Sequence, residues 1–155
     1  VLEIFDNKSI EIFLPRNDVE ISLDNVFDLI KIHEKSDIFY SEQLSKEIDF
    51  VSSHFFELSE SQEEKVGCLN IKTIERILEN CQLQLKDENQ LINFINRLYL
   101  RDSFYSNLYE YVFFSFVDEN KISEFIDIFD INDITHDIWL NISYRLKEKT
   151  INNDK

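Results

Sequence analysis

The residues that could do chemistry in this chain are three histidines, two cysteines and many carboxylates. His33, His54 and His136 each fall in a stretch with helical apolar spacing, and none has a second histidine four residues away. A zinc or iron site needs several ligands that converge from particular spacings. We therefore expect three surface or packing histidines and no metal. His136, beside Asp133 and Asp137, is the best remaining candidate for a ligand.

The two cysteines, Cys68 and Cys81, do not form a Cys-x-x-Cys pair, and neither has a histidine at ligand spacing. Thiols in this arrangement are typical of a reducing compartment. We expect both to be free and buried, with a disulfide between them as the alternative.

Carboxylates occur in adjacent pairs such as Glu63-Glu64, and Ser52-Ser53-His54 places a hydroxyl beside a histidine. Paired carboxylates support hydrolysis only in a cleft that raises one pKa. In a chain with 31 acidic residues such pairs are expected by chance on a solvated face. Adjacent residues of a helix point in different directions, so the serines and His54 do not form a nucleophile and base.

Two acidic segments, 118–120 and 130–133, resemble calcium-binding loops but lack the loop glycine and the terminal glutamate, so we interpret them as helix caps.

The 155 residues include one glycine, Gly67, one proline and no methionine. Phosphate loops, dinucleotide turns and nucleophile elbows all need glycines. We expect no catalytic residue, no cofactor and no enzyme activity. The missing methionine predicts a segment of a longer protein.

The net charge of −15 comes from 16 basic and 31 acidic residues. Nucleic acids and anionic membranes are bound by clustered Lys and Arg, which this chain lacks. No apolar run approaches the roughly 20 residues that span a bilayer. We expect a cytoplasmic or cytoskeleton-associated protein that binds neither nucleic acid nor a membrane. A basic protein partner is compatible with the charge but not required by it.

The elements that position these residues are helices, because apolar residues recur with helical spacing from Ser22 onward. We expect an all-α fold, mainly an antiparallel array of helix pairs, preceded by a short mixed α/β segment. That segment holds two short strands, 2–5 and 18–21, around a strand or short helix at 9–14. Helices are expected over 22–35, 42–56, 70–80, from 86 or 87, over 104–117, over 118–129, and from 132 or 133 to 148. An acidic connector, 57–69, contains at most a helical turn.

The aromatic stretch 104–117 is the strongest positive feature of the sequence. Its aromatic side chains cannot all face inward from one short helix. Interfaces between proteins are enriched in such residues. We therefore expect part of this stretch to contact a partner, and the candidates are Tyr105, Tyr109, Tyr111, Phe113 and Phe114.

Several segments together resemble the end of a BTB domain followed by a divergent BACK-like helical domain of protist BTB proteins. The segment 19–29, with Asp37-Ile38, resembles the strand and helix that close a BTB domain. The segment 83–91, Leu-Gln-Leu-Lys-Asp-Glu-Asn-Gln-Leu, resembles the BACK pattern that precedes a helix. Tyr109 to Phe114 and the Ile138-Trp139 helix resemble the divergent branch. The chain departs from the common BACK pattern after its fourth helix, where the aromatic stretch begins.

The resemblance implies domains over 1–40 (the end of a BTB-like domain, with the rest upstream) and 41–149 (BACK-like), and we expect a frayed tail at 150–155. It also implies a non-catalytic protein that dimerises through the upstream region. Such proteins hold substrates for cullin-type ubiquitin ligases, with the cullin-side groove at about 41–80, or serve as scaffolds. Our leading hypothesis is a protein-interaction module of an adaptor or scaffold. The alternatives are a structural subunit of a large cytoskeletal or ciliary assembly and, third, an enzyme.

Overall fold

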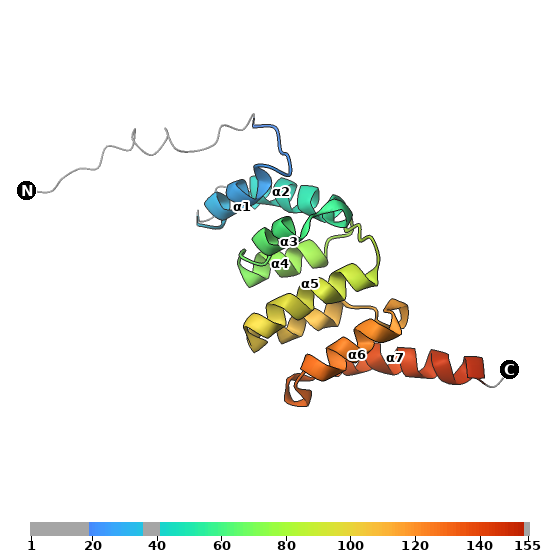
Figure 1. Ribbon diagram of the computed structural model, residues 1–155. Coiled ribbons are helices and arrows are strands. Elements are labelled where there is room, and N and C mark those ends of the chain that lie inside the picture. The colour runs from blue at the N-terminus through green and yellow to red at the C-terminus, as the bar shows by residue number, and fades with distance from the viewer. Residues whose placement is uncertain (1–18, 36–40, 154–155) are drawn as a thin grey trace, which may run out of the picture.

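The computed structural model describes residues 19–35 and 41–153, and every regular element in these ranges is a helix, which confirms the all-α class (Figure 1). The expected elements at 2–5 and 9–14 lie outside the described residues. The expected strand at 18–21 is wrong for its described part, since residues 19–21 are irregular. The side chain of Asn25 holds this segment instead: its amide donates to the Glu20 carbonyl (2.9 Å) and its oxygen accepts the Ser22 N–H (2.9 Å).

Seven α-helices and four 3₁₀ helices make up the described chain, and Figure 1 shows them stacked from α1 and α2 at one end to α6 and α7 at the other, in agreement with the expected array of helix pairs. Their bounds are α1 Val26–Glu34, α2 Ser41–Ser53, η2 Phe55–Glu57, α3 Glu60–Val66, α4 Ile71–Leu78, α5 Glu88–Arg101, η3 Ser103–Tyr111, η4 Phe114–Phe116, α6 Glu119–Ile128, η5 Ile131–Asp133 and α7 His136–Asn153.

Polar side chains at the expected positions begin two of these helices. The Asn70 side chain accepts the N–H of Lys72 at 3.0 Å, and Asp87 accepts the N–H of Gln90 at 2.8 Å. Such caps satisfy N–H groups that have no partner within a helix. The helices α4 and α5 therefore start where the sequence predicts.

The helix α3 corrects the prediction of a connector with at most one helical turn. It starts after Ser59, whose backbone N–H donates to the side chain of Gln62 at 2.9 Å, as in one half of a capping box. Its inner face carries Val66 and a carboxylate, Glu63, both of which are buried. Arg97 and Gln90 of α5 donate to this carboxylate, so the charge is partnered and does not prevent the helix from packing.

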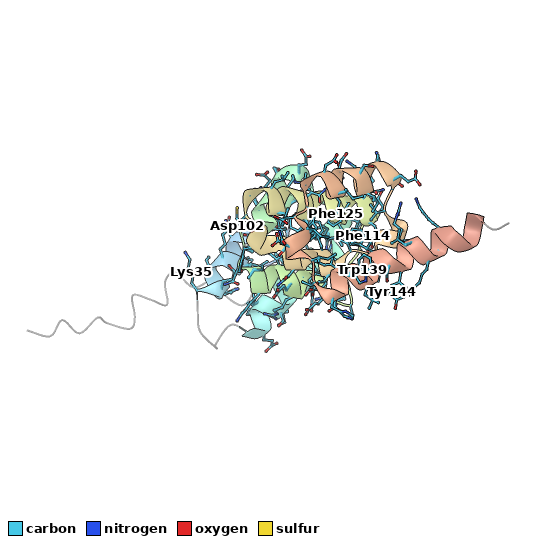
Figure 2. The ribbon with its side chains drawn as sticks, turned by 90° about the horizontal axis from the view of Figure 1, so that it is seen from below. Lys35, Asp102, Phe114, Phe125, Trp139 and Tyr144 are labelled. Atoms are coloured by element: carbon cyan, nitrogen blue, oxygen red, sulfur yellow. The ribbon has the colours of Figure 1, made fainter. Side chains whose placement is uncertain are left out.

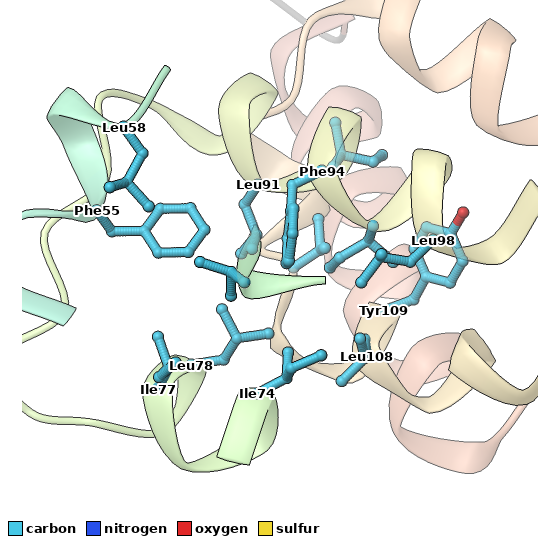
Figure 3. Packing of buried hydrophobic residues seen from close by; sticks show 14 of the residues in the cluster. Phe55, Leu58, Ile74, Ile77, Leu78, Leu91, Phe94, Leu98, Leu108 and Tyr109 are labelled. Carbon is cyan, nitrogen blue, oxygen red and sulfur yellow. The ribbon is translucent and has the colours of Figure 1, made fainter. Parts of the chain in front are cut away.

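The core is continuous along the stack, and Figure 3 shows its middle part, where α4, η2 and α5 meet. The helix α5 is central, as its wide apolar face predicts: six of its large side chains are buried, namely Leu91, Ile92, Phe94, Ile95, Leu98 and Tyr99. Gly67 lets α5 come close to the end of α3, because a Cβ at this position would lie 2.5 Å from the Leu98 side chain. The one glycine thus serves packing.

The stretch 104–117 forms two 3₁₀ helices, η3 and η4, and not the expected fifth α-helix. Asp102 begins η3 by accepting the N–H of Phe104 at 2.9 Å. The last helix, α7, also differs from the prediction: Asp130 caps the short η5, and α7 follows only after Thr135, whose hydroxyl accepts the N–H of Ile138 at 3.2 Å. The helix continues to Asn153, beyond the expected end at 148.

Candidate functional site

The helices η3 and η4, with Val112 and Phe113 between them, divide the aromatic stretch between core and surface. Leu108, Phe114 and Val117 are buried, whereas Phe104, Phe113 and Phe116 are exposed. The backbone geometry therefore brings three phenylalanines to the surface in the stretch that the sequence singles out.

The five aromatic residues expected to contact a partner have different positions. Tyr109 and Phe114 are buried within the chain, and Tyr105 and Tyr111 are half-buried. Only Phe113 of the five is exposed, with 62% of its surface accessible. The expectation is corrected for Tyr109 and Phe114, whose rings both pack against Phe125 in the core.

Tyr109 lies at the centre of an aromatic cluster that joins α5, η3 and α6. Its ring meets those of Phe125 and Phe129 edge to face, with centroids 4.9 and 5.3 Å apart. Its hydroxyl donates to the Asn96 side-chain oxygen at 2.7 Å. Burial raises the pKa of this hydroxyl, with a smaller contribution from Tyr99. Tyr109 is therefore a neutral donor in the core.

Tyr111 connects η3 to α4 through a hydrogen bond from its hydroxyl to Glu79 at 2.6 Å. Its pKa is raised, first by desolvation and then by Glu79 and the nearby negative charges of Glu75 and Glu110. Three carboxylates therefore lie near the hydroxyl of Tyr111 at the end of η3.

Arg145 of α7 fixes η4 in place. It is buried, and its Nη1 donates to the carbonyl oxygens of Phe114 and Val117 at 2.6 and 2.5 Å. These carbonyls lie at the end of η4, where the Phe114 carbonyl also accepts the N–H of Val117, and a cation there interacts favourably with the backbone dipoles. The contact sets how α7 lies over η4.

Phe113, Phe116 and Tyr144 surround a pocket of about 190 Å³ between η4 and α7, which we call the aromatic pocket. The three side chains are 62%, 73% and 51% exposed. Figure 2 shows Tyr144 on α7 near Phe114, which also lines the pocket. The remaining lining residues are Ser115, Asn141 and Glu148.

Sequence reasoning missed Phe116 and Tyr144. Phe116 belongs to the same aromatic stretch, which was expected to form one α-helix and forms η3 and η4 instead. On α7, Asn141, Tyr144 and Glu148 share one face because they are three and four residues apart. Nothing in the sequence indicates that this face meets η4.

The other candidate residues show no arrangement for catalysis. His33 is buried with its Nδ1 2.8 Å from the carboxylate of Glu47, and burial raises the pKa of Glu47, an effect that His33 partly offsets. His54 stacks on Phe50 with ring centroids 4.1 Å apart, and His136 is exposed. Within the described ranges no group of three or more His, Cys, Asp and Glu residues could hold a metal ion.

Both cysteines are free, as expected, but Cys68 and Cys81 are exposed and not buried. Each lies just after a helix end, where the chain turns at the surface: Cys68 follows α3 and Cys81 follows α4. The expectation of burial rested on residue type and not on position.

Two larger cavities flank α6. One, of about 500 Å³, lies against α5, and its basic residues Arg97 and Lys121 are already paired with carboxylates. The other, of about 390 Å³, is an apolar groove against α7 that includes Ile126 and Leu146.

No described helix is both long and apolar enough to cross a membrane. No family model, curated protein or solved structure matches the chain. Its class is therefore defined by its own architecture: an all-α stack of helix pairs with an aromatic surface near its C-terminal end.

Proposed function

We propose that this chain is a non-catalytic protein-interaction module of an adaptor or scaffold protein, and that the aromatic pocket is its docking surface. One observation carries the proposal. Of the twelve large apolar residues that are exposed in the described chain, nine lie at Leu100 or later, although most described residues come earlier. Three of the nine, Phe113, Phe116 and Tyr144, line the aromatic pocket together, and exposed apolar side chains grouped in this way are typical of an interaction site.

The chemistry of the surface fits the same function. Its exposed residues include aromatic side chains, which often dominate binding energy at interfaces. In the described chain, the catalytic candidates are separated, paired or used in packing. We therefore assign the surface a role in binding a protein partner and no chemical reaction.

A comparative pull-down tests this proposal. The full chain is compared with a variant of the pocket, Phe113→Ser with Phe116→Ser and Tyr144→Ser, and with a control variant, Ile32→Ser with Phe56→Ser. The control removes exposed apolar side chains from the other end of the stack. We expect partners held by the wild type and the control to be lost by the pocket variant. Equal recovery by all three, or a monomer without any stable partner, would contradict the proposal.

The adaptor and the alternative, a structural subunit, differ in where the protein is retained in cells. We expect an adaptor to leave with the soluble fraction after detergent extraction. Co-precipitation with a cullin, lost when α2 to α4 are altered at exposed positions, would support the role that the BTB-BACK resemblance implies. Retention with the insoluble cytoskeleton would support the structural subunit.

A further inference from the structure

We propose that the aromatic pocket binds a cationic side chain, arginine above all, from a basic segment of a protein partner. This inference rests on the proposed function and specifies its ligand. The pocket volume of about 190 Å³ is below the 300–1,000 Å³ typical of sites for whole small molecules. It is therefore of a size for one side chain.

The rings that line the pocket favour a cation. The face of an aromatic ring carries partial negative charge and attracts ammonium and guanidinium groups. The protein already uses one of these rings in this way, because the ammonium of Lys147 lies 5.7 Å from the centroid of the Tyr144 ring. A partner's cation would meet the same chemistry at Phe113 and Phe116, which are both exposed.

Polar groups in the pocket also select a donor with positive charge. Glu148 lines the pocket and makes no ion pair with any side chain that the structure describes. Asn141 uses its amide N–H to bind the Glu110 carbonyl at 2.9 Å, which leaves its side-chain oxygen as an acceptor. An apolar side chain would desolvate both groups without bonding to them, at a cost that a guanidinium avoids.

Charge beyond the pocket supports the same ligand. Glu88 accepts the N–H of Phe113 at 3.1 Å, and the hydroxyl of Tyr111, two residues earlier, donates to Glu79 at 2.6 Å with Glu75 and Glu110 nearby. With a net charge of −15, the protein attracts basic partners over long range. By contrast, in the apolar groove of α6 and α7 the rim charges Glu119 and Lys149 pair with each other and leave no charge to select a ligand.

Arginine suits the pocket better than lysine for a physical reason. Its planar guanidinium can stack on a ring while it donates to oxygen acceptors in its own plane, and it is more weakly hydrated than an ammonium. The Asn141 oxygen and the Glu148 carboxylate offer such acceptors beside the rings.

The test titrates the full chain with three capped Gly/Ser peptides that carry three consecutive arginines, citrullines or leucines at their centre. Citrulline keeps the shape of arginine but removes its charge. Binding is followed by NMR shifts of the aromatic residues and by the fluorescence of Trp139, the one tryptophan, which lies on α7. We expect the arginine peptide to bind at least about tenfold more tightly than the other two, and to weaken as salt is added.

Two variants separate the cation from a merely apolar contact. Tyr144→Leu keeps an apolar side chain but removes the ring, so arginine binding should weaken about threefold to tenfold. Lys147→Gln removes the internal cation that competes for the Tyr144 ring, so binding should become tighter. Lys149→Gln is the matched control, because it removes an equal charge from α7 that pairs with Glu119 instead. It should tighten binding less than Lys147→Gln.

Tighter binding of the leucine peptide, equal binding of citrulline, or no shift at the pocket residues would overturn the proposal. None of these results would affect the loss of partners by the pocket variant in the pull-down, which judges the proposed function. If the pocket variant keeps its partners while the arginine peptide still binds, the ligand chemistry stands and the docking role fails.

Discussion

The helices α1 to α4 bury mostly aliphatic side chains and, with the chain around them, leave three large apolar residues exposed, whereas the part from Leu100 onward packs aromatic rings and leaves nine exposed. The first part uses α-helices, whose repeat of 3.6 residues gathers apolar residues on one face. The second begins with 3₁₀ helices, whose tighter repeat divides a dense aromatic stretch between core and surface. Large apolar residues are therefore mostly buried in the first region and divided between core and surface in the second.

The largest expected effect contrasts two phenylalanines. Phe55 is fully buried and meets Phe94 edge to face, with ring centroids 5.5 Å apart, so Phe55→Ala should lower the free energy of unfolding by about 3–5 kcal/mol. Phe113→Ala, at an exposed ring, should change it by less than about 0.5 kcal/mol. Urea unfolding followed by circular dichroism measures both. Similar losses for the two variants would remove the contrast between core and surface rings.

The second effect concerns the contact that holds α7 to η4. Arg145→Leu removes the buried donor of two backbone carbonyls, of which only that of Phe114 keeps another donor (the Val117 N–H), and unfolding should become easier by about 2–3 kcal/mol. Lys149→Leu, on the same helix, removes only an exposed ion pair with Glu119 and should cost at most about 1 kcal/mol. Thermal unfolding compares them. An equal loss of stability in both variants would show that the buried Arg145 contact contributes no more than the exposed ion pair of Lys149.

A smaller effect tests the polar centre of the aromatic core. Tyr109→Phe keeps the ring but leaves the buried Asn96 oxygen without its donor, and should cost about 1–2 kcal/mol. Tyr144→Phe removes the hydroxyl of an exposed ring and should be close to neutral. Denaturant unfolding at constant pH measures the difference. A neutral result for Tyr109→Phe would mean that the hydroxyl contributes little beyond its ring.

The smallest effect is a dependence on pH at the edge of the aromatic pocket. Burial raises the pKa of Glu88 above its ordinary value of 4.5, the N–H of Phe113 partly offsets this, and Asp87 raises it further. From pH 4.5 up to the raised pKa, the folded state holds more protons than the unfolded state, so the Glu88 contribution to stability falls as pH rises. Glu88→Gln should therefore gain stability relative to the wild type between pH 4.5 and 7.

Glu119 provides the control of opposite sign for that measurement. Its hydrogen bond and ion pair with Lys149 lower its pKa, so its contribution is present at neutral pH and is lost as pH falls through the lowered pKa. Glu119→Gln should lose stability relative to the wild type as pH rises from the lowered pKa to about 4.5, which lies just below the window of Glu88. If both variants shifted in the same direction, the assigned causes would be wrong.

The sequence predicts the α-helical part of the fold well because its signals are local. Asn70 and Asp87 stand directly before runs of apolar residues, and a cap followed by such a run has few other structures available. The helix α3 was missed because its inner face is short and includes the charged Glu63, whose partners come from α5. Contacts between distant segments are not visible as a local pattern.

The candidate site shows the same limit. Phe113 could be named from the sequence, because an aromatic stretch of that density must expose some rings. The exposure of Phe116 follows from a 3₁₀ repeat, which competes closely with the α-helical one in short segments. Tyr144 joins the pocket because Arg145, its neighbour in sequence, holds α7 against η4.

The buried contact of Arg145 also gives the molecule a mechanical property. The end of α7 extends beyond the rest of the stack (Figure 1), and two contacts hold the helix near that end: the buried guanidinium of Arg145 on η4 and the exposed ion pair of Lys149 with Glu119. Any movement of α7 relative to η4 would therefore change the shape of the aromatic pocket, because the two elements line it together.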